Sequence, residues 1–301
     1  GGATALNWNI AVDTNPAGVF TVAGVVDPGA ALPTPVDMDI LFAAEYLRVS
    51  GSLTGIDIFG LITGGANFAL VKQLVDIDLD GNVATAADQY DDAEMLTFAL
   101  DTLNLRVGTT GFGIDITSGQ IAIASIQSGS LSWTAVRAGN IGATLTLPGI
   151  TATVSSLTVE INKAGGGASA LDWTKAVDTD PAGGWIGADV VDPGQALPVP
   201  VNLAIAFTSE YLKVGGSLSG VDIFGLITGS ADFAIVQQLV DIDSDGDGNG
   251  STGTQYNDAQ MLTLALDDLS LAVGIAGFGI DITSGQIAIA SIQSGSLSWT
   301  A

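Results

Sequence analysis

The chain has 301 residues, of which 47% are apolar and 13% are charged. Its 32 acidic side chains outnumber 7 lysines and arginines, and the net charge of −25 excludes a basic patch for nucleic-acid phosphates and disfavours an anionic membrane surface. Cysteine and histidine are absent, which removes disulfides, thiolate and imidazole metal ligands, and Ser-His-Asp triads. No uncharged apolar run reaches the roughly 18 residues that a membrane helix needs.

The chain consists of two copies of one unit about 165 residues long. Residues 111–135 recur letter for letter at 277–301, and the offset grows by one residue after an acidic loop. The units are residues 1–165 and 166–301, and the second lacks the counterpart of residues 136–165. A repeat this long and faithful predicts a tandem array. We expect the chain to be a slice of a longer array. Its last residue, Ala301, is expected to end inside the fold rather than at the edge of a domain.

Each unit opens with a proline-rich segment, at residues 13–35 and 178–200. Proline at this density cannot pair inside a central strand. Each segment is therefore predicted to be either a linker between units or a long connection over the sheet.

Period-two alternation of apolar and polar residues follows these segments. Glycine and serine turns interrupt it about every ten residues, which predicts short strands. The alternation slips near Thr102, where we expect a β-bulge. Residues 91–103 also fit an N-capped helix, because acids precede an apolar run there.

The predicted fold is all-β, an elongated tandem β-repeat. Two arrangements remain open: solenoid-like stacking, which pairs every strand edge except the terminal ones, and β-sandwiches in series.

The sharpest motif is a D-x-D-x-D-G run in each unit, which resembles the first half of an EF-hand or dockerin-type calcium loop. Alternate carboxylates around a glycine turn can converge on one hard cation. The bidentate glutamate is missing, because its position holds Ala87 or Thr252. A solvated acidic turn is the alternative. We expect calcium, with candidate ligands Asp76, Asp78 and Asp80 in the first unit and Asp241, Asp243, Asp245, Asp247 and Asn249 in the second.

No catalytic or organic-cofactor residues are assigned, and the chain is predicted not to be an enzyme. The tryptophans are interpreted as packing residues rather than a sugar-stacking platform. They are Trp8, Trp133, Trp173, Trp185 and Trp299. Asp57, Asp115, Asp222 and Asp281 precede turns, which predicts turn capping. Glu45 and Glu210 are lone acids.

Together with the acidic loop, the segments LDW, AVDT, VVDPG and SLTGIDIFGLITG resemble tandem-repeat regions of very large, acidic bacterial extracellular adhesin-like or matrix proteins. The resemblance implies a structural or adhesive role at the cell surface, often calcium-dependent. We expect a repetitive extracellular structural protein (a filament, stalk or surface-layer module) stiffened by calcium. The alternative is a carbohydrate- or surface-binding adhesin module. Expected partners are copies of itself or adjacent repeats of a longer chain, with a surface glycan under the alternative, and neither nucleic acid nor membrane insertion.

Overall fold

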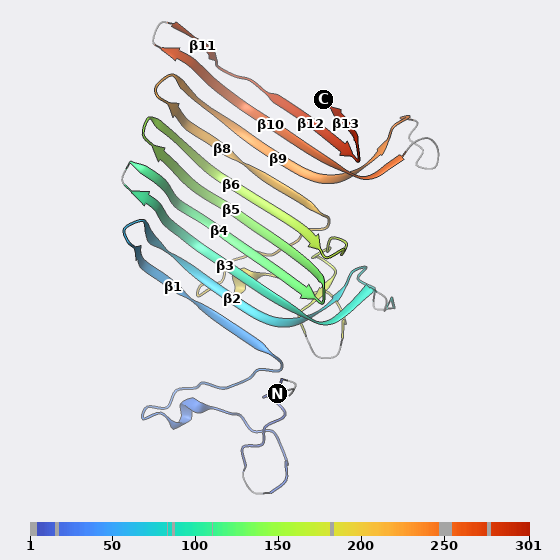
Figure 1. The fold of residues 1–301 in the computed structure, drawn as a ribbon. Coiled ribbons are helices and arrows are strands. Elements are labelled where there is room, and N and C mark those ends of the chain that lie inside the picture. Colours follow the sequence, from blue (N-terminus) through green and yellow to red (C-terminus); the bar gives the residue numbers. More distant parts are fainter. Residues whose placement is uncertain are drawn as a thin grey trace.

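The structure is a computed structural model that describes residues 5–15, 18–82, 84–85, 88–109, 111–180, 184–246, 255–275 and 278–301. It confirms the all-β prediction: all strands of the described residues belong to one open antiparallel sheet (Figure 1). The strands are β1 (Tyr46–Ile58), β2 (Ile62–Asp78), β3 (Gln89–Thr109), β4 (Phe112–Ser128), β5 (Leu131–Leu147), β6 (Ile150–Gly165), β7 (Val177–Asp178), β8 (Tyr211–Ile223), β9 (Ile227–Asp243), β10 (Gln255–Ile275), β11 (Phe278–Ile282), β12 (Ile287–Ser294) and β13 (Leu297–Thr300). Two short 3-10 helices, η1 (Pro28–Ala31) and η3 (Pro193–Ala196), occupy equivalent sequence positions in the two units.

The sheet is a meander in which long strands pair with their neighbours in chain order (Figure 1). At the border between the sequence units, β6 pairs with β8, with Glu160 opposite Lys213 and Ile161 opposite Leu212. The backbone hydrogen bonds of the sheet therefore run without interruption from the first unit into the second. The two units seen in the sequence share one sheet.

The bulge expected near Thr102 is confirmed. The register between β2 and β3 steps from Gly65 opposite Asn104 to Asn67 opposite Asp101, and Thr102 has a φ of 50°. Residues 91–103 lie in β3, so the alternative of an N-capped helix is wrong. Pairing with β2 and β4 satisfies the backbone of this segment on both sides, which local helix signals cannot match.

A long connection between β6 and β8 crosses one face of the sheet; we call residues 168–180 and 184–209 the strap (Figure 1). Within it, β7 pairs with β2, so that Val177 lies opposite Ile77. Further along, η3 contacts β2, β3 and β4. The proline-rich segment at 178–200 is thus a connection over the sheet, and it belongs to the second unit while covering the first.

The main hydrophobic core lies between the strap and the first unit's part of the sheet. Its sheet members are Val75, Ile77, Ala93, Met95, Ala124, Ile126, Trp133 and Ala135. Its strap members are Leu171, Trp173, Ala176, Val177, Val191, Ile205 and Phe207. A second cluster packs Leu197 and Leu203 of the strap on Ala69, Ala99 and Ala122, where small side chains let the leucines approach the sheet.

Hydrogen bonds from buried side chains hold the two ends of the strap. The indole Nε1 of Trp173 donates to Asn162 Oδ1 at 2.9 Å, and Asn162 Nδ2 donates to the carbonyl oxygens of Leu171 and Ser209 at 2.9 and 2.7 Å. The indole Nε1 of Trp133 donates to Ser169 O at 2.9 Å. These polar groups are satisfied inside an apolar core, which ties the strap to a single position.

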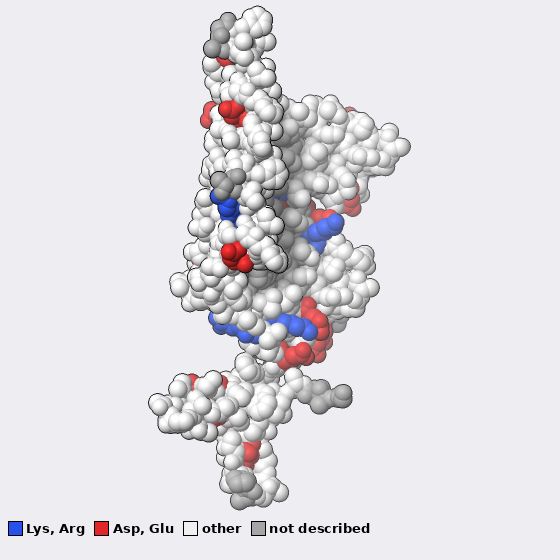
Figure 2. All heavy atoms as spheres, turned by 60° about the vertical axis from the view of Figure 1, so that its left-hand side comes forward, with Lys and Arg blue, Asp and Glu red and all other residues white. Residues whose placement is uncertain are grey.

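The corresponding segment of the first unit, residues 5–15 and 18–45, has no sheet beneath it; we call it the N-terminal segment. It stands clear of the sheet, beyond β1 (Figures 1 and 2). Its internal hydrogen bonds match those of the strap. Trp8 N donates to Phe42 O at 2.8 Å, and Ile40 N to Val26 O at 2.9 Å, as the equivalent residues do in the strap. The segment therefore adopts the conformation of the strap without burying its apolar side chains.

Candidate functional site

The first acidic loop is a tight turn after β2 that Asp78 holds from within. Asp78 is buried, and its Oδ1 accepts hydrogen bonds from the backbone N–H groups of Asp80 and Gly81 at 3.1 and 2.8 Å. Gln89 Nε2 donates to its Oδ2 at 2.9 Å. Burial opposes ionisation, but these hydrogen bonds together lower the pKa of Asp78. The oxygens of Asp78 thus serve the turn, as in an Asx-turn.

Asp76 is the unusual carboxylate of this loop. It is 1% exposed, its Oδ1 accepts from Asp92 N at 2.8 Å, and its Oδ2 is buried without a hydrogen-bond partner. Asp178 of the strap lies opposite it in the β2–β7 ladder. Burial raises the pKa of Asp76, and the negative charges of Asp91, Asp92 and Asp178 raise it further. This environment favours a proton or a cation at the free oxygen.

The predicted ligands of the first loop are not brought together as a set. Among the described residues, the only group of three or more acids whose oxygens, one from each, all lie within 4.8 Å of one another is Asp27, Asp37 and Asp39 of the N-terminal segment. Burial raises the pKa of Asp39, with the charges of Asp37 and Asp27 adding to the effect. Sequence reasoning missed this cluster, although VVDPG marks Asp27.

The Asp27 cluster does not recur in the strap, where the equivalent residues are Asp192, Asn202 and Ala204. What recurs is the turn: Asp27 Oδ1 accepts from Gly29 N, and Asp192 Oδ1 accepts from Gly194 N at 3.0 Å. The conserved part of this motif is therefore the cap of the 3-10 helix.

The second acidic loop repeats the hydrogen bonds of the first without its burial. Asp241 Oδ1 accepts from Asp258 N at 3.0 Å, and Asp243 Oδ1 accepts from Gly246 N at 3.3 Å. Asp241 is exposed, and no segment among the described residues covers it as the strap covers Asp76. Asp245 is also exposed, and the predicted ligands Asp247 and Asn249 lie outside the described residues.

Hairpin tips at one end of the sheet carry exposed phenylalanines that the sequence analysis did not single out. Phe59, Phe112, Phe224 and Phe278 lie at the β1–β2, β3–β4, β8–β9 and β10–β11 turns, and Phe59 is 94% exposed. These turns share one edge of the molecule (Figure 1). The repeated DIFG and GFGIDI sequences were the available signal. The structure thus presents a row of aromatic rings along the sheet.

The aspartates of two such tips cap their turns, as predicted. Asp57 Oδ1 accepts from Gly60 N at 2.7 Å, and Asp222 Oδ1 accepts from Gly225 N at 2.6 Å.

The prediction that the tryptophans are packing residues is confirmed for Trp133 and Trp173, both of which are fully buried. 

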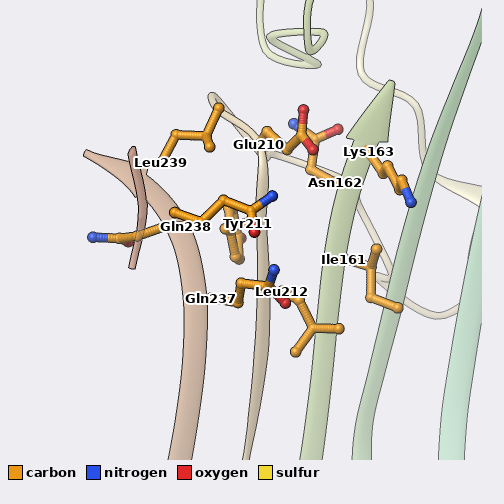
Figure 3. Close-up of a pocket in the computed structure, with 10 residues that line it drawn as sticks. Ile161, Asn162, Lys163, Glu210, Tyr211, Leu212, Gln237, Gln238 and Leu239 are labelled. Carbon is orange, nitrogen blue, oxygen red and sulfur yellow. The ribbon is translucent and has the colours of Figure 1, made fainter. Parts of the chain in front are cut away.

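A shallow hollow of about 290 Å³ lies where the strap joins β8 (Figure 3). Tyr211 Oη donates to Glu160 Oε2 at 3.3 Å, and Lys213 Nζ lies 3.8 Å from the same oxygen. Burial raises the pKa of Tyr211 to about 12, and the charge of Glu160 contributes. Tyr211 therefore stays a neutral hydrogen-bond donor near neutral pH. The hollow is lined by Ile161, Asn162, Lys163, Glu210, Tyr211, Leu212, Gln237, Gln238, Leu239 and Gln260.

Comparisons with models of protein families, with curated proteins and with solved structures found no match. Within the described part of the chain, no helix is both long and apolar enough to cross a membrane.

Proposed function

We propose that this chain is a repetitive extracellular structural protein, a filament, stalk or surface-layer module stiffened by calcium. The observation that carries the proposal is the strap, by which the second unit builds the hydrophobic core of the first. Pairing of β6 with β8 adds continuous backbone hydrogen bonds across the same border.

A chain joined in this way resists bending and separation between units. Serial domains on a flexible linker move independently, whereas a shared sheet and a shared core couple each unit to its neighbour. The resemblance of the acidic, cysteine-free repeats to adhesin-like proteins supports the extracellular setting.

Calcium is proposed because acidic groups are concentrated where the units meet. Asp76 carries a buried oxygen without a partner, and Asp178 of the strap and Asp91 and Asp92 of β3 add negative charge around it. A divalent cation would offset this repulsion and the chain's net charge of −25. Because Asp178 belongs to the strap, such an ion would strengthen the joint between units.

Electron microscopy of the native source, with antibodies raised against this chain, tests the proposed role. Label on filaments, stalks or a surface layer outside the cell is the expected result. Label confined to the cell interior would contradict it.

A carbohydrate- or surface-binding adhesin module is a second candidate, and the row of exposed phenylalanines favours it. Aromatic rings spaced along one edge can stack on repeating apolar faces of a glycan or surface. Binding of the chain to a glycan array would be compared with that of a Phe59→Ser, Phe224→Ser variant. Selective binding that the variant loses supports this candidate, and the absence of binding removes it.

A further inference from the structure

The second unit presents the same sheet face that the strap covers in the first. Each sheet residue of the main core has an identical counterpart one repeat later. These counterparts are Val240, Ile242, Ala259, Met261, Ala290, Ile292, Trp299 and Ala301. The alanines beneath the strap leucines recur as Ala234, Ala265 and Ala288.

This second face, which we call the open face, lies on β9, β10, β12, β13 and the adjoining Ala301, and no segment of the described residues covers it as the strap covers the first. Apart from Ala259, its residues are partly or fully exposed. Ala265 is exposed, whereas its counterpart Ala99 is fully buried. The open face thus keeps the side chains that bind a strap, in the same register, with β10 pairing β9 and β12 as β3 pairs β2 and β4.

The N-terminal segment carries the complementary surface. Each strap residue of the main core has an identical counterpart in it, namely Leu6, Trp8, Ala11, Val12, Val26, Ile40 and Phe42. Leu6 and Phe42 are 43% and 46% exposed, whereas Leu171 and Phe207 are buried. Its backbone already has the conformation of the strap, so docking would cost little ordering entropy.

We propose that the N-terminal segment of one copy of this chain docks on the open face of a second copy, as the strap docks on the first unit. Val12 would then lie opposite Ile242, as Val177 lies opposite Ile77. This inference deepens the proposed structural role and depends on it only for the biological setting.

The contact is heterologous, because it joins two different surfaces of the chain. Each docking leaves one N-terminal segment and one open face unoccupied, so the copies should add head to tail without closing.

Complementation between two full-length variants tests the proposal. Leu6→Asp places a charge on the docking side of the N-terminal segment, and Ala265→Asp places one on the open face. Both positions are exposed in the single chain, so neither change should unfold it. Sedimentation velocity would follow each variant, their equimolar mixture and the unmodified chain over a range of concentrations. All samples contain millimolar calcium, because docking would bring Asp13 opposite Asp241.

The unmodified chain should form longer species as its concentration rises, and each variant alone should stay monomeric. The mixture should form a dimer and stop there, because one intact segment meets one intact face. Val25→Asp and Gln293→Asp are the matched controls. Their counterparts Val190, 74% exposed, and Gln127 face solvent even with the strap in place, so both controls should assemble like the unmodified chain. A monomeric unmodified chain at every concentration, or a mixture without dimer, would overturn the proposal.

Cysteine cross-linking fixes the register of the contact, because the natural chain has no cysteine. Chains with Val12→Cys mixed with chains with Ile242→Cys should form a disulfide-linked heterodimer under oxidation, since residues directly opposite in a ladder lie within disulfide range. Val25→Cys in place of Val12→Cys should give none, and equal yields from both would overturn the register. If the antibody labels extracellular filaments but the chain does not dock in solution, this inference is wrong and the proposed function stands. If the chain docks in solution but the antibody labels only the cell interior, the proposed function is wrong and this inference stands.

Discussion

Trp133 and Trp299 occupy the same position of identical sequences, yet Trp133 is fully buried and Trp299 is 37% exposed. Each packs on a tyrosine of the strand that follows the acidic loop, which is β3 in the first unit and β10 in the second. The ring centroids are 5.6 Å apart for Tyr90 and Trp133 and 5.5 Å apart for Tyr256 and Trp299. The sheet therefore positions both rings alike. Trp133 is covered by the strap and has β6 beside it, with Ala164 opposite, whereas Trp299 lies in β13, which ends the order of described strands and pairs with β12.

Replacement of these two tryptophans should have unequal effects. Trp133→Ala removes a fully buried ring and its hydrogen bond to Ser169, and should lower the free energy of unfolding by about 3–5 kcal/mol. Trp299→Ala should cost clearly less in dilute solution, where no second copy covers it. Urea unfolding of both variants measures the difference. Equal losses at low concentration would show that the strap contributes little to the core.

Glycine should be required in the strap turn. A Cβ at Gly194 would collide with the carbonyl oxygen of Val201, so Gly194→Ala should shift the strap and lower the free energy of unfolding by about 1–3 kcal/mol. Gly29→Ala meets the same obstacle at Val36 in the N-terminal segment. Because that segment covers no sheet in the single chain, this change should leave urea unfolding of the sheet nearly unaltered. A larger loss from Gly29→Ala would contradict this account.

Asn162 should contribute to stability through its three hydrogen bonds. Asn162→Ala leaves the indole N–H of Trp173 and the carbonyl of Leu171 without their partner, which should cost about 1–3 kcal/mol of unfolding free energy. The control is Asn202→Ala, an exposed strap position whose side chain accepts a hydrogen bond from nearby Ala204 N, with an expected change within about 0.5 kcal/mol. Urea titrations compare the two, and similar small changes would mean that the buried network adds little.

Asp76 should make stability depend on pH. Its pKa is raised in the folded protein by burial and neighbouring acids, so its favourable contribution is full below the unfolded pKa of about 3.9 and is lost as the pH rises through the folded pKa. In chelator at pH 7, Asp76→Asn should therefore raise the unfolding free energy, with Asn Oδ1 still accepting from Asp92 N. The advantage over the natural chain should vanish near pH 3. A destabilised variant in chelator at pH 7 would argue against a raised pKa.

Calcium should raise the melting temperature. An ion bound only by the folded chain adds about 2.7 kcal/mol at 100 times its Kd. Melting in millimolar calcium and in excess chelator measures the shift, and Asp76→Asn should reduce it more than Asp241→Asn, because Asp241 is exposed and lacks a facing strap. Identical melting temperatures with and without calcium would remove the ion from the proposal.

The sequence by itself determined the repeat, the all-β fold, the bulge at Thr102 and the turns capped by Asp57 and Asp222, because strand period and turn chemistry are local properties. The sequence also marked the acidic loops, but it did not show that the carboxylate oxygens of Asp78 accept hydrogen bonds within the turn.

Only the tertiary structure decided what covers each face of the sheet. Alternation along a strand places Trp133 and Trp299 on one face but cannot say whether another segment lies on it. The strap leaves β6 and folds back over the first unit, so Trp133 and Asp76 become buried while Trp299 and Asp241, in the same local sequence, stay open. Burial depends on contacts between residues far apart in the chain, and identical sequences acquire different environments for that reason.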